Sequence, residues 1–98
     1  MKYEKNNEGF IKKFIDKKTK YVESMNSLIV EGDKIYSYAM LIADRKKKKI
    51  YHTKYSMTTS LHIGKIKRLC NYKVIDTIAY NSGTGFTLRN KKTNKVIK

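Results

Sequence analysis

A run of five basic residues, RKKKK at 45–49, separates two segments that are rich in apolar and aromatic side chains. So much charge cannot be buried, so the run is expected at the tip of a β-hairpin. The preceding segment, 34–44, alternates, and both of its faces are largely apolar, which predicts one strand in the interior of a sheet. Segment 49–55 is expected to return as the paired strand. A hairpin spanning 34–55 therefore constrains the fold more than any other feature.

The remaining elements complete one small domain over residues 1–98. Apolar residues at helical spacing predict a helix over 8–18, which either docks on the core or lies on a membrane surface. Strands are expected at 27–30, 73–80 and 86–90, with turns at Gly32 and at 81–85. A second helix is expected from 58–60 to about residue 71, and 91–98 is a basic tail that can fray.

The predicted fold class is α+β. The order is helix, three strands, helix, two strands, which favours a small antiparallel sheet of about four to five strands with one or two helices packed on it.

Charge is strongly unbalanced and unevenly distributed. The chain has 23 Lys and Arg against 8 Asp and Glu, a net charge of +15. Segment 21–44 has one lysine and four acids, whereas segment 45–54 has six basic residues and no acid. A field of this size attracts polyanions, so nucleic acid, DNA or RNA, is the expected partner. An AT-rich genome, which favours lysine, asparagine, isoleucine and tyrosine codons, is an alternative source of part of the lysine content.

A set of basic residues is predicted to contact the phosphates of a nucleic acid or an acidic partner protein. The hairpin tip would act as a finger along the phosphate backbone, and the second helix would extend its surface. The alternative for the tip is a solvated loop. The predicted contact residues are Arg45, Lys46, Lys47, Lys48, Lys49, Lys54, Lys65, Lys67, Arg68 and Arg89.

The start of the second helix has two interpretations. The hydroxyls of Thr58, Thr59 and Ser60, together with the free N–H groups of a helix N-terminus and with His62, would form an anion pocket. Alternatively, the three hydroxyl residues only cap the helix, and His62 is a partly buried residue of its apolar stripe.

Two motifs within 35–68 resemble a family of small uncharacterised proteins of tailed phages. The first is Tyr36-Ser37-Tyr38, and the second, more specific one is Tyr-Ser-x-Thr-Thr-Ser-x-His at 55–62. The match covers about a third of the chain. The resemblance implies a phage or prophage origin and no mechanism, and it raises a second class of function, an inhibitor that binds a host protein of defence or replication.

Catalytic chemistry is not expected. The lone Cys70 permits no internal disulfide and no zinc site based on cysteines, and His52 with Asp44 across the hairpin lacks a third partner. No cofactor or metal is predicted.

The sequence contains no apolar run near the roughly 20 residues that span a bilayer, and the N-terminus does not read as a signal peptide. We therefore expect a non-enzymatic protein of the host-cell cytoplasm without membrane contact. A homodimer is an alternative to a monomer, because exposed apolar strand faces would allow two copies to associate.

Overall fold

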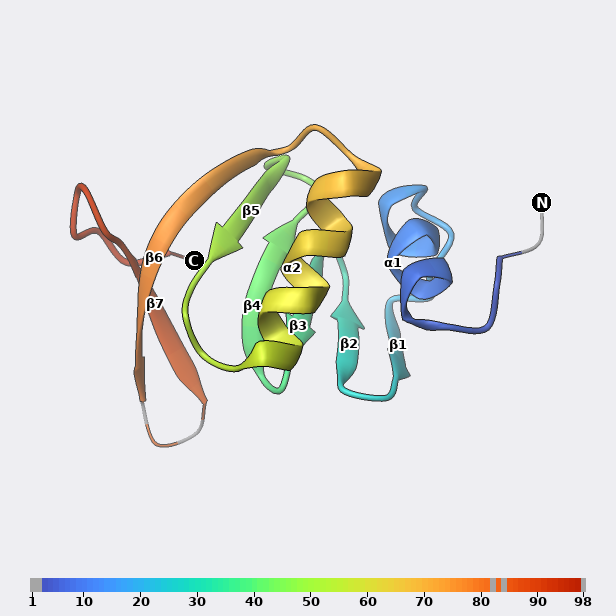
Figure 1. The fold of residues 1–98 in the computed structure, drawn as a ribbon, viewed down its shortest axis with the longest axis horizontal. Helices are drawn as coiled ribbons and strands as arrows, with labels where there is room; N and C mark the ends of the chain where they lie inside the picture. The colour runs from blue at the N-terminus through green and yellow to red at the C-terminus, as the bar shows by residue number, and fades with distance from the viewer. Residues whose placement is uncertain (1–2, 82, 84, 98) are drawn as a thin grey trace.

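The computed structural model describes residues 3–81, 83 and 85–97, and it is an α+β fold with two helices and one strongly curved sheet (Figure 1). The helices are α1 (Asn7–Ile15) and α2 (Met57–Leu69). The strands are β1 (Val22–Met25), β2 (Leu28–Glu31), β3 (Lys34–Ser37), β4 (Met40–Asp44), β5 (Lys49–His52), β6 (Lys73–Asn81) and β7 (Phe86–Asn90). The α+β class is confirmed, but the expectation of four to five strands is wrong, because the sheet has seven.

The seven strands lie side by side in chain order, and one neighbouring pair is parallel. Lys49 to His52 of β5 pair with Lys73 to Asp76 of β6 in parallel, whereas every other neighbouring pair is antiparallel. A parallel pair needs a crossover, and α2 provides it by returning the chain to the end where β5 began. The expected antiparallel sheet is therefore a mixed one.

Segment 34–44 is a hairpin and not the single strand that its alternation suggests. Tyr38 and Ala39 form a two-residue turn, with φ angles of 51° and 66°. Ser37 pairs with Met40 directly across this turn, so both are buried on the same face. Positive φ at both central residues matches the twist of a tight hairpin. Because this turn contains no Gly, Asn or Pro, the apolar pattern continues through it and conceals it.

Strand β1 is the other strand that the sequence pattern misses. Two of its four residues, VESM, are polar and none is buried, which is typical of an edge strand. Among the described residues it pairs only with β2, through a turn at Asn26, where φ is 54°. The predicted strands at 27–30, 73–80 and 86–90 correspond to β2, β6 and β7, and Gly32 turns the chain at φ 63°.

Both helices pack against the sheet, and their apolar stripes form the core together with the inner faces of the strands. Phe10, Ile11 and Phe14 of α1 are almost fully buried, which confirms that this helix docks on the core. Ile63 and Ile66 of α2 join the same core. No helix in the described part of the chain has the length and apolar content to cross a bilayer.

Helix α2 begins earlier than expected. Its N-cap is Ser56, whose Oγ accepts a 3.1 Å hydrogen bond from the Thr59 N–H, so the residues at 58–60 lie inside the helix. Ser56 is the N-cap in place of the residues at 58–60, because its side-chain oxygen lies three residues before a backbone N–H that has no partner within the helix.

Residues 91–97 fold back along β7. The Ile97 N–H donates to the Leu88 carbonyl at 2.8 Å, and Val96 forms a bridge with Arg89.

Candidate functional site

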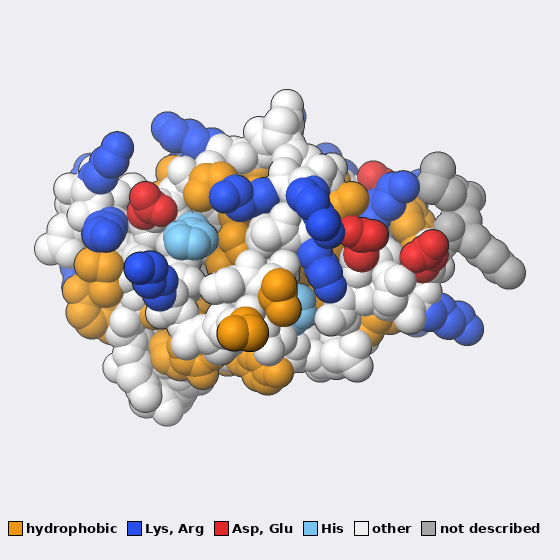
Figure 2. All heavy atoms as spheres, in the orientation of Figure 1, with side chains coloured by type: hydrophobic (Ala, Val, Ile, Leu, Met, Phe, Trp, Pro, Cys, Tyr) orange, Lys and Arg blue, Asp and Glu red, His pale blue; other side chains and the backbone are white. Residues whose placement is uncertain are grey.

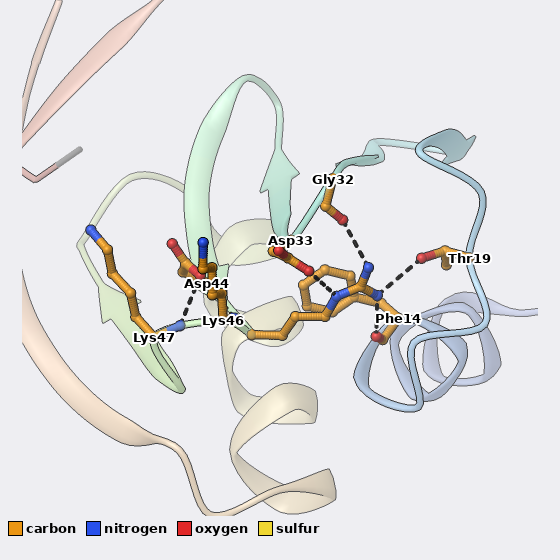
Figure 3. A network of polar contacts seen from close by, with 8 residues as sticks. Phe14, Thr19, Gly32, Asp33, Asp44, Lys46 and Lys47 are labelled. Atoms are coloured by element: carbon orange, nitrogen blue, oxygen red, sulfur yellow. Dashed lines mark hydrogen bonds and ion pairs between the residues drawn. The ribbon is translucent and has the colours of Figure 1, made fainter.

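The turn at 45–48 joins β4 to β5, and this confirms the expected hairpin tip. Its first residue, Arg45, is largely shielded from solvent, and Figure 3 labels the residues whose oxygen atoms accept its hydrogen bonds. The Arg45 side chain is 10% exposed, and its Nε donates to Asp33 at 2.8 Å. Its other nitrogens donate to the carbonyl of Phe14 at 2.7 Å, the carbonyl of Gly32 at 3.0 Å and Thr19 Oγ1 at 3.3 Å. Arg45 therefore fastens the hairpin tip to α1 and to the β2–β3 turn.

Aromatic packing adds to this anchor. The Arg45 guanidinium lies 4.9 Å from the centre of the Phe14 ring, which is itself buried. A guanidinium over a ring face gains electrostatic attraction, and its planar fork matches several acceptors at once. The same guanidinium is the main reason that the pKa of Asp33 lies below its ordinary value, and Lys46 and Lys17 contribute in the same direction.

Asp44 shapes the turn that follows Arg45. Its buried carboxylate Oδ1 accepts hydrogen bonds from the backbone N–H groups of Lys46 at 3.0 Å and Lys47 at 3.1 Å. A carboxylate that accepts from two consecutive turn amides fixes the turn. Lys46, Lys47 and Lys48 are exposed, and we call these three residues the lysine turn. Figure 3 shows the Lys47 side chain extending away from the Arg45 contacts.

Two further lysines lie beside the lysine turn. The Lys73 N–H donates to the Lys48 carbonyl at 3.0 Å, which places the start of β6 next to the turn. The loop after α1 is close as well, because the Phe14 carbonyl accepts hydrogen bonds from both Arg45 and the Lys17 N–H. Figure 1 places the C-terminal end of α2 at this same edge of the sheet. Lys17, Lys73 and the lysine turn form what we call the basic end. Figure 2 shows that basic side chains are spread across the whole width of the visible face.

The other predicted contact residues are spread over the molecule. Lys65 and Arg68 face α1, since Arg68 Nη2 donates to Glu8 at 2.8 Å and Lys65 lines a hollow with Asn7. Lys67 is exposed in the last turn of α2, and Lys49 is partly buried at the start of β5. Two basic residues lie away from the basic end: Lys54 beyond the far end of β5, and Arg89 on β7, with its guanidinium 5.8 Å from the Tyr80 ring centre.

The four residues of the predicted anion pocket do not lie on one open surface. Thr59 and His62 are buried, whereas Ser60 is exposed and Thr58 is half-buried. Ser37 Oγ lies 2.9 Å from His62 Nδ1 and 3.2 Å from Thr59 Oγ1. The polar atoms of Thr59 and His62 are therefore engaged inside the protein.

His62 is also in contact with α1. Its Nε2 lies 3.3 Å from Asn7 Nδ2, so a neutral ring can donate from one nitrogen and accept at the other. Burial lowers the pKa of His62 below its ordinary value, and the nearby charge of Lys65 adds to this. The arrangement fits a neutral histidine that fastens α2 to the sheet.

His52 and Asp44 do not meet across the hairpin. Asp44 pairs with Lys49, and the partner of His52 is Asp76 on β6, with 3.5 Å between Nδ1 and Oδ1. Within residues 3–81, 83 and 85–97, no three His, Cys, Asp or Glu side chains gather as a set of metal ligands.

Sequence reasoning missed Lys17 and Lys73 as neighbours of the lysine turn, because only the parallel β5–β6 pair and the Arg45 contacts bring them there. It also missed a groove of about 470 Å³ between residues 52–55 and β6. The alternation of tyrosine and lysine near Tyr55 is the one sequence signal that points toward this groove.

No family model, curated protein or solved structure matches this chain. A function is therefore proposed from the fold and the surface.

Proposed function

We propose that this protein binds nucleic acid through phosphate contacts, without catalysis, and that the lysine turn is the centre of its contact surface. The observation that carries the proposal is the construction of this turn: three successive exposed lysines stand on a turn that Arg45 and Asp44 fix from beneath. Because these contacts already hold the backbone of the turn, little backbone order has to be created when the surface meets a polyanion.

The chemistry of the surface favours contacts to phosphates over contacts to bases. A lysine ammonium is a compact point charge with three donors, and it attracts a phosphate without requiring one orientation. Arg45, the one arginine of the run, is engaged with Asp33 and three further acceptors. The expected binding is therefore tolerant of sequence, and DNA and RNA are both candidates.

Two triple variants with equal net charge test the proposal. Lys46, Lys47 and Lys48 are changed to Glu in the first, and the exposed residues Lys5, Lys92 and Lys95 are changed to Glu in the second. Fluorescence anisotropy with labelled oligonucleotides should show an affinity loss at least tenfold larger for the first variant, and the loss should be similar for unrelated sequences. Equal losses in the two variants would show that only net charge matters and would remove the lysine turn from the proposal.

Binding to a host protein, as an inhibitor of a defence or replication component, is a second candidate. Met57 and Leu61 lie one turn apart on α2 and are 82% and 60% exposed. Figure 2 shows hydrophobic side chains exposed over the lower part of α2. Adjacent exposed apolar side chains are typical of protein contact sites. The test is capture of a partner protein from host lysate. A partner that remains bound after nuclease treatment, and that no longer binds the double variant Met57→Asp, Leu61→Asp, would favour this candidate over nucleic acid.

A further inference from the structure

The sheet opens where β5 ends. Strand β6 has nine residues, and β5 pairs only with the first four of them, Lys73 to Asp76. After His52 the chain leaves the sheet toward α2, and the groove of about 470 Å³ lies between this departing segment and β6. Figure 1 shows the segment curving away from β6 before α2 begins.

Beyond Asp76, the edge of β6 on the β5 side has no strand partner among the described residues, and the groove lies along it. Successive residues of a strand direct their backbone groups to opposite edges. The Lys73 N–H points to β5, as its bond to Lys48 shows, and the Asp76 carbonyl points to the β7 side, where it accepts from the Lys91 N–H at 2.9 Å. By alternation, the N–H and C=O of Ala79 point to the β5 side, which is the groove. The groove therefore offers a donor and an acceptor on a rigid strand.

An aromatic pair stands at the groove. The Tyr55 and Phe86 rings meet edge to face, with centroids 4.9 Å apart and an interplanar angle of 69°. Both residues line the groove, and Tyr55 is 46% exposed. Phe86 thus supports the Tyr55 ring from one side, and Tyr55 as a residue stays about half exposed to solvent. A ring fixed in this way stacks on a planar ligand with little loss of side-chain entropy.

Cations line the same groove. Lys54 comes from the segment that leaves β5, and Lys91 follows β7. Asp76 is the acid of the lining, and His52 lies 3.5 Å from its carboxylate. Two ammonium groups beside an open aromatic ring and a pair of free backbone groups match the parts of a nucleotide, which are a phosphate, a planar base and its polar edge.

We infer that the groove between residues 52–55 and β6 binds an unpaired base of single-stranded nucleic acid, with the base against Tyr55 and the flanking phosphates near Lys54 and Lys91. This inference rests on the proposed function, and it names the class of nucleic acid that is preferred. In a duplex the base faces are covered by their neighbours, so a duplex can contact the lysine turn and cannot fill this groove.

The experiment compares a fluorescein-labelled dT15 strand with a labelled 15-base-pair duplex by anisotropy at one salt concentration. The wild-type protein should bind dT15 at least about fivefold more tightly than the duplex, because only an unpaired base can stack on the Tyr55 ring. Tyr55→Ala should remove this preference and leave duplex binding unchanged, and Tyr55→Phe should keep it. The matched control is Tyr38→Ala, which removes a tyrosine of similar exposure on the β3–β4 turn and should also keep it. Circular dichroism establishes that each variant is folded.

The possible outcomes separate the two proposals. Equal affinity for dT15 and duplex, or a preference that survives Tyr55→Ala in a folded variant, overturns the groove as a base site and leaves the lysine turn standing. Absence of binding to both probes overturns both proposals. A third outcome is that an extended acidic peptide binds independently of Tyr55 and is not displaced by dT15. This result would assign the edge of β6 to strand addition and would also overturn the inference.

Discussion

The Nδ1 atom of His62 on α2 lies 2.9 Å from the Oγ atom of Ser37 on β3, and both residues are buried. This contact joins the helix to the sheet across 25 residues of sequence. Ser37 immediately precedes the Tyr38–Ala39 turn within 34–44, and His62 is the last residue of the sequence motif at 55–62. The two motif segments therefore meet inside the protein.

The His62 environment predicts a stability that falls on mild acidification. Because burial lowers the pKa of His62 in the folded state, the unfolded chain binds a proton below its ordinary pKa of about 6.5 and the folded protein does not. The free energy of unfolding should thus decrease as the pH falls below about 6.5, toward the folded-state pKa. Urea denaturation between pH 7.5 and 5.5 measures this slope in the wild type and in His62→Gln. A slope that is identical in the two proteins would contradict the assignment.

Arg45 is predicted to stabilise the fold and not to contact a ligand. Arg45→Lys keeps the charge and loses the planar fork that reaches Asp33, Phe14 and Gly32. The loss should be about 1–3 kcal/mol of unfolding free energy, because hydrogen bonds to charged groups contribute on that scale. The neighbouring Lys46→Ala is the control, and its expected effect is within about 0.5 kcal/mol. Equal effects in thermal or urea denaturation would show that the Arg45 contacts do not hold the turn.

The Tyr38–Ala39 turn predicts a stabilising substitution. Asn at 38 and Gly at 39 suit the positive φ angles of 51° and 66° better than Tyr and Ala do. Tyr38→Asn with Ala39→Gly should raise the unfolding free energy by about 1 kcal/mol. The same Ala→Gly change at the buried strand residue Ala43 should lower it. If both Gly variants are destabilised to the same extent, position 39 does not carry backbone strain.

The sequence predicts the parts of the fold that local periodicity encodes. Apolar spacing finds α1 and most of α2, and charge places the turn at 45–48. Periodicity fails at Tyr38–Ala39, where ordinary residues adopt a turn conformation because the strands on either side are held by Ile35, Met40 and their partners. It also fails at the parallel pairing of β5 with β6, because the sequence of one strand does not indicate the direction of the neighbouring strand.

The candidate site was also predictable only in part, because local sequence indicates exposure and does not indicate contacts between distant residues. The exposure of Lys46, Lys47 and Lys48 follows from their charge. The burial of Arg45 does not, since it depends on acceptors at residues 14, 19, 32 and 33, which are distant in the sequence. Lys73 and the groove beside Tyr55 depend on the course of β6, which only the tertiary structure reveals.

The salt dependence of nucleic-acid affinity tests the central claim most directly. Binding of a labelled oligonucleotide is measured from low to physiological salt, and the logarithm of the association constant is plotted against the logarithm of the salt concentration. Neutralisation of phosphates by the lysine turn releases counterions, so the slope should be negative, and Lys46→Ala, Lys47→Ala, Lys48→Ala should reduce its magnitude by about 2–3. An affinity that does not change with salt, or a slope that is the same in the triple variant, would contradict the account.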